Sequence, residues 1–161
     1  SGISYTEPFF ADASAILVQG GQITDIAQLY GKTIAVVQNS TLAASSEKDK
    51  DVNILEEYLG KLGISVTVKK FASYPEAVDA LKTGVVSGIA ASELNLKRFG
   101  IKGMLLLPER FLPSRYCVQV RSGLGAFSQA VSDCIAEMKR DGTLAALAEK
   151  WNLVDYSALG S

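Results

Sequence analysis

Short β-branched segments alternate with helix-forming segments along the chain, and this alternation is the strongest constraint on its fold. Residues 33–37, Thr-Ile-Ala-Val-Val, have the continuous apolar character of a buried parallel strand. The same reasoning predicts further strands at residues 13–19, 65–68, 85–91, 104–107 and 116–121. It predicts helices at residues 24–29, 41–48, 54–62, 75–83, 94–99, 124–140 and 143–151. Thr24 and Ser73 are the expected caps, Pro75 fits a first helical turn, Leu62 belongs to a helical apolar stripe, and residues 47–51 indicate an exposed charged connection. The alternation therefore predicts an α/β fold, a mainly parallel sheet with helices on both faces, followed by two C-terminal helices.

The polar turn that follows the strand at 33–37 is the best candidate site. In sheets of this kind, ligands bind beyond the carboxyl ends of the strands, where helices begin. Gln38, Asn39, Ser40 and Thr41 form this turn, and Ser or Thr is favoured where a helix starts. The free N–H groups and the dipole of a following helix would bind a small anion such as a carboxylate. We therefore expect a binding site here, and simple helix capping is the alternative.

The composition excludes several classes of function. The 16 basic and 17 acidic side chains nearly balance, and no basic stripe with interleaved aromatics indicates nucleic-acid binding. The chain has no histidine, which excludes histidine general bases and histidine metal ligands. We therefore predict no metal, no cofactor and no catalytic residue. Cys117 and Cys134 lack the close spacing of a zinc or redox motif, and the helical apolar pattern around Cys134 predicts a core thiol.

Several motifs occur in an order that is typical of one family. They are Tyr-Thr-Glu-Pro-Phe at 5–9, the segment from Ile23 to Val36, the turn at 39–41, Ala-Leu-Lys-Thr-Gly at 80–84, and Asp-Gly-Thr-Leu-x-x-Leu-x-x-Lys-Trp at 141–151. With these motifs the chain resembles the bacterial extracellular solute-binding proteins of amino-acid ABC transporters, which have the type II periplasmic-binding fold. In that family two lobes, joined by two crossing strands, close on a ligand.

The resemblance implies one complete lobe and part of another. Residues 1–17 would form the end of the first lobe and the first crossing strand, and residues 18–116 would form the second lobe. Residues 117–161 would form the second crossing strand and the C-terminal helices of the first lobe. A missing segment or a partner chain would supply the rest of the first lobe. An apolar face on the helix at 124–140, which includes Phe127, would need cover and also suits a homodimer.

The function implied by the resemblance is capture of a small polar, amino-acid-like ligand for an ABC permease. The location would be periplasmic or extracellular, with or without a membrane anchor. One alternative is a ligand-sensing domain of a membrane signalling receptor. Others are a degenerate cleft and a dehydratase-like enzyme on the same fold, for which Glu7 and Glu93 are the only candidate acids.

The second candidate site segment departs from the family pattern. The family has an Asp at the end of the strand at 85–91, where it pairs with the ligand's α-ammonium; here Ser92 takes that place and Glu93 follows. A neutral serine cannot balance a buried ammonium. Either Glu93 takes the role, or the ligand is not an ordinary α-amino acid, or ligand binding is lost. Glu93 could also be an exposed residue in the first turn of a helix, where acids are favoured.

Tyr74 lies near the end of another predicted strand and could line the same cleft. The full set of predicted ligand-binding residues is Gln38, Asn39, Ser40, Thr41, Tyr74, Ser92 and Glu93.

Overall fold

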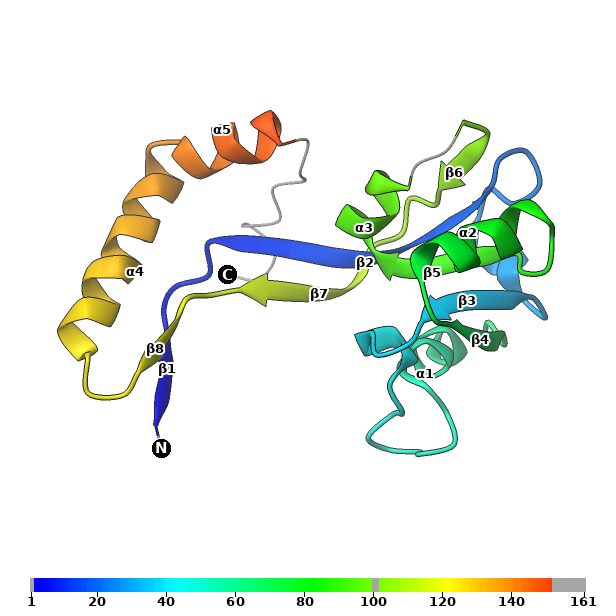
Figure 1. Ribbon diagram of the computed structural model, residues 1–161, viewed down its shortest axis with the longest axis horizontal. Helices are drawn as coiled ribbons and strands as arrows, with labels where there is room; N and C mark the ends of the chain where they lie inside the picture. The colour runs from blue at the N-terminus through cyan, green and yellow to red at the C-terminus, as the bar shows by residue number, and fades with distance from the viewer. Residues whose placement is uncertain (1, 100–101, 152–161) are drawn as a thin grey trace. The chain divides into compact units, whose positions relative to one another are not determined.

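The computed structural model describes residues 2–99 and 102–151 and divides the chain into two compact units (Figure 1). Unit 1 comprises Ser1–Ala13 and Leu112–Ser161, and unit 2 comprises Ser14–Phe111. The chain passes from one unit to the other within strand β2 (Phe10–Gln19) and again at the start of strand β7 (Phe111–Tyr116). Both connections are therefore strands, and β7 pairs with β2.

Unit 2 is built on a mixed sheet whose strand order is β4-β3-β5-β2-β6. The central strand β3 (Thr33–Val37) pairs in parallel with β4 (Thr67–Phe71) and with β5 (Gly88–Ser92). The crossing strand β2 runs antiparallel to β5 and to β6 (Met104–Leu106). The predicted α/β sheet is confirmed, and both of these antiparallel pairs involve β2.

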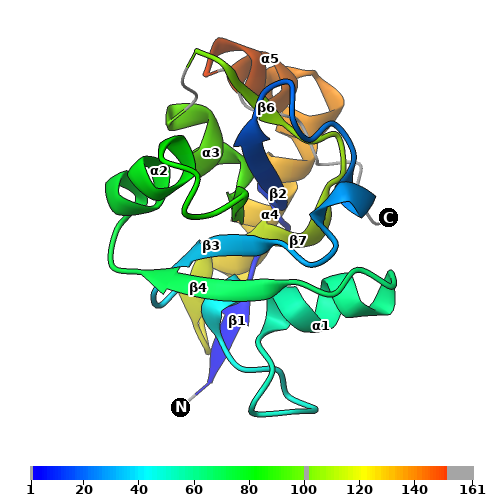
Figure 2. The same cartoon turned by 90° about the vertical axis from the view of Figure 1, so that its right-hand side faces the viewer.

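Alternate residues of these strands face two separate hydrophobic cores, as the period of a strand requires. Ile16 and Ile34 belong to the core that α1 (Ile54–Lys61) covers. Leu17 and Ala35 belong to the core formed with α2 (Tyr74–Lys82) and α3 (Glu93–Arg98). Figure 2 shows α1 on one side of β3 and β4, and α2 and α3 on the other. The predicted layer of helices on each face is therefore confirmed.

Helix starts in unit 2 follow recognisable sequence signals. The Ser73 side chain accepts a hydrogen bond from the Glu76 N–H at 3.4 Å, and Pro75 lies in the first turn of α2. Before α1, the Asn53 side chain accepts from the Glu56 N–H at 2.9 Å, and the Glu56 carboxylate accepts from the Asn53 N–H at 3.2 Å. This reciprocal pair is a capping box. The Ser73 cap, which the sequence predicts, is confirmed.

The helix predicted at residues 41–48 is wrong. Only Thr41–Ala43 form a short 3-10 helix, η2. The Ser46 hydroxyl then accepts a hydrogen bond from the Lys48 N–H at 3.1 Å. Side chains that bond nearby backbone groups compete with helical hydrogen bonds, so this segment forms a loop. The exposed charged connection predicted at 47–51 is confirmed.

Other predicted boundaries also shift. The first short helix is the 3-10 helix η1 (Ile26–Leu29), and its cap is Asp25 rather than Thr24, because the Asp25 carboxylate accepts from the Ala27 N–H at 2.7 Å. Leu62, predicted to belong to the apolar stripe of α1, is 52% exposed. It is the residue that ends the helix, so its side chain no longer follows the helical stripe.

The described residues of unit 1 form two strands and two helices beside its share of β2 and β7. The single strand predicted at 116–121 is wrong, because a separate strand β8 (Gln119–Arg121) pairs antiparallel with β1 (Ile3–Tyr5). Between β7 and β8, the Val118 N–H donates to the Thr6 hydroxyl at 3.0 Å. The Thr6 N–H also donates to the Val118 carbonyl at 3.0 Å, so backbone pairing continues between the two strands.

The two C-terminal helices are confirmed as α4 (Gly125–Arg140) and α5 (Thr143–Lys150). On α4, Ile135 is buried, whereas Phe127 is 58% exposed. Cys134 is free and exposed, so the prediction of a core thiol is wrong. Adjacent residues of a helix point in directions about 100° apart, which is why Cys134 can be exposed beside a buried Ile135. Within the described ranges, no helix is both long and apolar enough to cross a membrane.

Glu57 links α1 to the loop that precedes it, and this link depends on pH. The Lys61 ammonium lies 2.8 Å from Glu57 Oε1, and the Ser46 hydroxyl donates to Glu57 Oε2. Hydrogen bonds from Lys61 and Ser46 hold the pKa of the Glu57 carboxyl below its ordinary value of 4.5. A lowered folded-state pKa stabilises the fold above the ordinary value, and the contribution is lost as pH falls through the folded value.

We therefore expect the Tm of Glu57→Gln to fall less steeply than that of the parent protein as pH drops below 4.5. The amide does not titrate, so the variant lacks the proton uptake that destabilises the parent. Circular dichroism melts at a series of pH values measure both slopes, and Glu47→Gln in the exposed loop is the control, expected to follow the parent. Parallel slopes for Glu57→Gln and the parent would contradict the prediction.

Candidate functional site

The turn after β3 is held in a defined conformation by backbone hydrogen bonds. The Gln38 N–H donates to the Phe71 carbonyl at 2.8 Å, and the Ser40 N–H donates to the Val37 carbonyl at 3.2 Å. Asn39 has a φ of 61°, in the left-handed region that Gly and Asn tolerate best. Asn is therefore one of the few residue types that suit position 39.

Ser40 does not act as a helix cap. Its side chain makes no capping hydrogen bond to η2, and its Oγ atom is buried with no partner in the described part of the chain. Buried polar groups are nearly always hydrogen-bonded, so an orphaned hydroxyl calls for an explanation. One staggered rotation about χ1 redirects a serine hydroxyl, so this group could bond a ligand beside the turn.

The turn borders a hollow of about 340 Å³ in unit 2. Gln38, Asn39 and Ser40 line it, and Lys70 adds a positive charge from the end of β4. Thr41 is exposed and does not line it. The sequence analysis missed Lys70, although the parallel pairing of β4 with β3 places it level with Val36.

The proposed helix-dipole contribution at this turn is not supported, because the helix predicted there is absent. The helix η2 has three residues, which is too short to carry a substantial macrodipole. The side-chain hydrogen-bond donors that line the hollow are those of Gln38, Asn39, Ser40 and Lys70. The turn can therefore bind a small acidic group through side chains rather than through a helix end.

The second predicted segment lies where β5 ends and α3 begins. The Ser92 hydroxyl accepts a hydrogen bond from the Asn95 N–H at 3.3 Å and so caps α3. The Asn95 side-chain amide donates to the Tyr74 hydroxyl at 3.1 Å, and the Tyr74 ring stacks on Phe99. Asn95, which the sequence analysis did not single out, thus brings Ser92 and Tyr74 into one local network.

Glu93 is buried, so its interpretation as an exposed helix-start residue is wrong. It is 3% exposed, and its carboxylate forms a two-bond pair with the Arg110 guanidinium, at 2.7 Å from Nε to Oε2 and 3.1 Å from Nη2 to Oε1. The Lys97 ammonium lies 3.1 Å from Oε1. Both carboxylate oxygens therefore already have cationic partners, as a buried charge requires.

Arg110 is in turn fixed by backbone carbonyls. Its Nη1 donates to the Leu107 carbonyl at 2.5 Å and to the Glu109 carbonyl at 3.0 Å. The Glu93 pair thus ties the start of α3 to the chain just before β7. Beside it, the Oε2 atom of Glu109 is buried with no hydrogen-bond partner among the described residues.

Close packing explains why a glycine stands at the start of β5. A Cβ atom added at Gly88 would lie 3.1 Å from Ile16 Cγ2 and 3.3 Å from Ile34 Cδ1. An alanine at this position would therefore press on two residues of the α1-side core. The neighbouring Ser87 is half-buried. Its neutral hydroxyl supplies no carboxylate that could pair with the ammonium of a ligand.

The structure thus places the predicted residues in two groups, one after β3 and one after β5. Because β3 and β5 are parallel neighbours, both groups lie at the carboxyl edge of the sheet. No group of three or more Cys, Asp or Glu residues within the described ranges could hold a metal ion. The edge offers hydrogen-bond donors and fixed charges, which suit binding.

The sequence has detectable relatives, although no family model matches it. It is 32% identical to the L-cystine-binding protein TcyJ of Escherichia coli K12 over 99 residues, which are 60% of this chain and 37% of that protein. It is 26% identical to the amino-acid-binding protein AabA of Dichelobacter nodosus over 152 residues, 91% of this chain and 56% of that protein. The chain thus spans about half or less of the length of these relatives.

The fold has close counterparts among solved structures. The second substrate-binding domain of a putative amino-acid ABC transporter from Streptococcus pneumoniae superposes with a TM-score of 0.70 at 17% identity, over 92% of this chain and 64% of that one. The sheet of unit 2 and its two crossing strands define a lobe of the type II periplasmic-binding fold. The relatives of this chain are amino-acid-binding proteins, and the resemblance predicted from its motifs is confirmed.

Proposed function

We propose that this chain is the ligand-binding part of an extracytoplasmic solute-binding protein that captures a small, polar, amino-acid-like molecule for an ABC transporter. The observation that carries the proposal is the hollow beside Gln38, Asn39 and Ser40, with its orphaned hydroxyl and Lys70, in a chain related to amino-acid-binding proteins. The acidic group of the ligand would lie against this turn. Lobe closure would then favour the ligand-bound state.

The proposed organisation follows the two-lobed relatives. Residues 18–116 would act as the second lobe, and residues 1–17 and 117–161 would belong to the first lobe and the crossing strands. Further chain, in the same polypeptide or a partner, would complete the first lobe. The exposed Phe127 on α4 supports a covering contact there, and a second copy of the chain is the other candidate for that cover.

Recognition of an ammonium group needs a carboxylate that is free to pair. Glu93 has Arg110 and Lys97 as partners, so in our proposal it positions α3 and the chain before β7. Glu109 has a buried oxygen without a partner in the described chain, and it is the candidate in unit 2 to balance an ammonium. Thr41, Ser92 and Tyr74 remain proposed wall residues of the same cleft.

The candidate site favours binding over the enzymatic alternative. The relatives are named as binding proteins, and the buried carboxylate of Glu93 is held by two cations. A general acid or base needs a carboxyl that can exchange a proton with substrate. The Glu93 carboxylate is instead paired with Arg110 and Lys97. A sensor domain would use the same ligand site and the same closure, with a signalling partner in place of the permease.

We expect Ser40→Ala to weaken ligand binding by about tenfold or more, because a hydrogen bond to a charged group contributes about 1.5–3 kcal/mol. The variant should fold as stably as the parent, since the Ser40 hydroxyl has no partner in the described chain. Calorimetric titration of an amino-acid panel, against this chain joined to a first lobe, measures the affinities. Thr41→Ala removes the other hydroxyl group of the turn and is titrated in the same way.

Ser45→Ala is the matched control, because Ser45 is an exposed serine in the neighbouring loop and does not line the hollow. Its affinity should equal that of the parent. Equal affinities for Ser40→Ala and the parent would remove the turn from the site. A folded two-lobed protein that binds no member of the panel would contradict the amino-acid assignment.

A further inference from the structure

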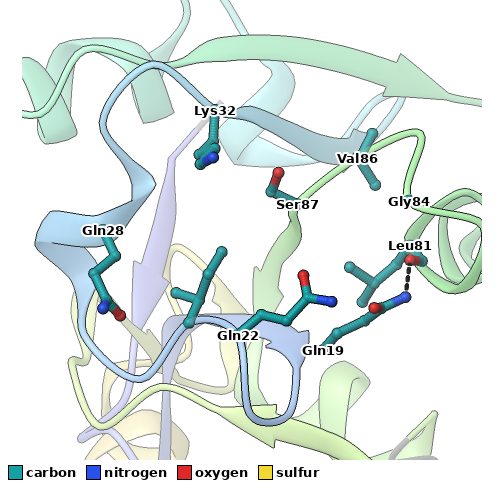
Figure 3. Close-up of a pocket in the computed structure, with 9 residues that line it drawn as sticks. Gln19, Gln22, Gln28, Lys32, Leu81, Gly84, Val86 and Ser87 are labelled. Carbon is teal, nitrogen blue, oxygen red and sulfur yellow. Dashed lines mark hydrogen bonds between the residues drawn. The ribbon is translucent and has the colours of Figure 1, made fainter.

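A second hollow lies at the opposite edge of the unit 2 sheet. Its volume is about 330 Å³, and it is lined where β2 ends and where β3 and β5 begin, by residues that include Gln19, Lys32 and Ser87 (Figure 3). The turn at 38–41 follows the other end of β3. Since β3 has five residues and a strand rises about 3.3 Å per residue, the two hollows are separated by roughly 15 Å.

Two glutamine side chains of this hollow are held in fixed orientations. The Gln28 carbonyl oxygen accepts hydrogen bonds from the Thr24 N–H at 2.8 Å and the Asp25 N–H at 3.2 Å, so its NH₂ group is the end that remains for a ligand. The Gln19 NH₂ group donates to the Leu81 carbonyl at 2.6 Å and the Lys82 carbonyl at 3.0 Å. The hollow therefore has a preorganised donor at Gln28 and an acceptor at Gln19.

A positive charge and a hydroxyl line the same hollow. Lys32 immediately precedes β3 and Ser87 immediately precedes β5, and Figure 3 shows both side chains among those that line it. Ser87 is fixed by its own N–H, which donates to the Thr33 carbonyl at 2.8 Å. No Asp or Glu is among the residues that line the hollow, and Lys32 forms no ion pair with any described residue. The charge of the lining is thus positive.

Three apolar side chains and a third glutamine, Gln22, also line the hollow. Ile23, Leu81 and Val86 line it and are all buried. A hollow of 330 Å³ lies near the lower end of the range of about 300–1,000 Å³ for small-molecule sites. The one charged side chain of the lining is Lys32, so a small ligand with a negative group suits the hollow, and a short apolar body would meet Ile23 and Val86.

We propose that this hollow is a second binding site, for a small organic carboxylate. Lys32 and Ser87 donate to the carboxylate, and the aliphatic body of the ligand lies on Ile23 and Val86. The site is independent of the turn at 38–41 and of the proposed transport function. It gives unit 2 a means of binding a metabolite at the edge of its sheet opposite to the turn at 38–41.

The test is a titration of the whole chain with isovalerate, followed by amide chemical shifts in NMR spectra. Saturable shifts should centre on Lys32, Gly84 and Ser87, with a dissociation constant below about 10 mM. Lys32→Met should weaken binding by roughly tenfold or more, since a charge-assisted hydrogen bond is lost. Lys50→Met, in the exposed loop, is the matched control and should leave the affinity unchanged.

Two further probes separate the parts of the proposal. Isovaleramide has the same shape without the charge and should bind at least tenfold more weakly, and inorganic phosphate should also bind more weakly because it lacks an apolar body. Ser40→Ala should leave isovalerate binding intact, so failure here and failure of the transport proposal are distinguishable. The proposal is overturned if no saturable shift occurs, if Lys32→Met binds as well as the parent, or if phosphate or the amide binds as tightly as isovalerate.

Discussion

Replacing Arg110 with methionine is expected to lower the free energy of unfolding by about 3 kcal/mol or more, the usual result of leaving a buried charge without its main partner. Glu93 is 3% exposed, and both of its carboxylate oxygens bond Arg110, at 2.7 and 3.1 Å. Lys97 would remain, but it forms a single contact and its side chain is 31% exposed. Chemical denaturation followed by circular dichroism measures the difference.

Arg98→Met is the matched control for Arg110→Met. Arg98 is an exposed arginine at the end of α3 with no ion pair in the described part of the chain, so its loss should cost under about 0.5 kcal/mol. The double variant Glu93→Met with Arg110→Met should recover part of the lost stability, because no buried charge is left unpaired. An Arg110→Met variant as stable as the parent would show that the pair does not hold this part of the fold.

Replacing Leu59 with alanine is expected to cost about 3 kcal/mol, within the range of 2–5 kcal/mol for buried leucines. Leu59 is 0% exposed on α1 and lies in the core that joins this helix to the sheet. The loss combines the transfer energy of the removed methyl and methylene groups with the cavity that they leave. Denaturant unfolding with an unchanged slope would show that the native contacts alone are weakened.

Leu62→Ala in the same helix segment is the control. Leu62 is 52% exposed, so its truncation should change stability by less than about 0.5 kcal/mol. Both leucines match the helical apolar pattern, and only the structure separates them. Equal losses of stability for Leu59→Ala and Leu62→Ala would contradict the burial of Leu59 and the exposure of Leu62.

The parts of the fold that local patterns determine could be predicted from the sequence. Residues 33–37 form β3 with the predicted bounds, because a run of β-branched and small apolar residues suits a strand buried on both faces. Ser73 and Pro75 start α2 as expected, because the hydroxyl cap and the fixed proline φ are local effects. The order of such elements was enough to predict the α/β class.

Features that depend on contacts distant in sequence were missed. Arg110, which neutralises Glu93, lies 17 residues from it, so an isolated Glu93 gave no sign of being buried. Lys70 joins the turn at 38–41 only through the register of β4 with β3. The wrong helix at 41–48 has a different cause, because a serine with a local hydrogen-bond partner formed a loop in a stretch of helix-forming residues.

The measurement that tests the central claim most directly is a ligand-bound crystal structure of this chain joined to a first lobe. The account predicts the acidic group of an amino-acid-like ligand within hydrogen-bond distance, about 3 Å, of the Ser40 hydroxyl or the Lys70 ammonium. It also predicts that the pair between Glu93 and Arg110 remains intact beside the ligand. A ligand bound away from the turn at 38–41, or one whose ammonium has displaced Arg110 from Glu93, would contradict the account.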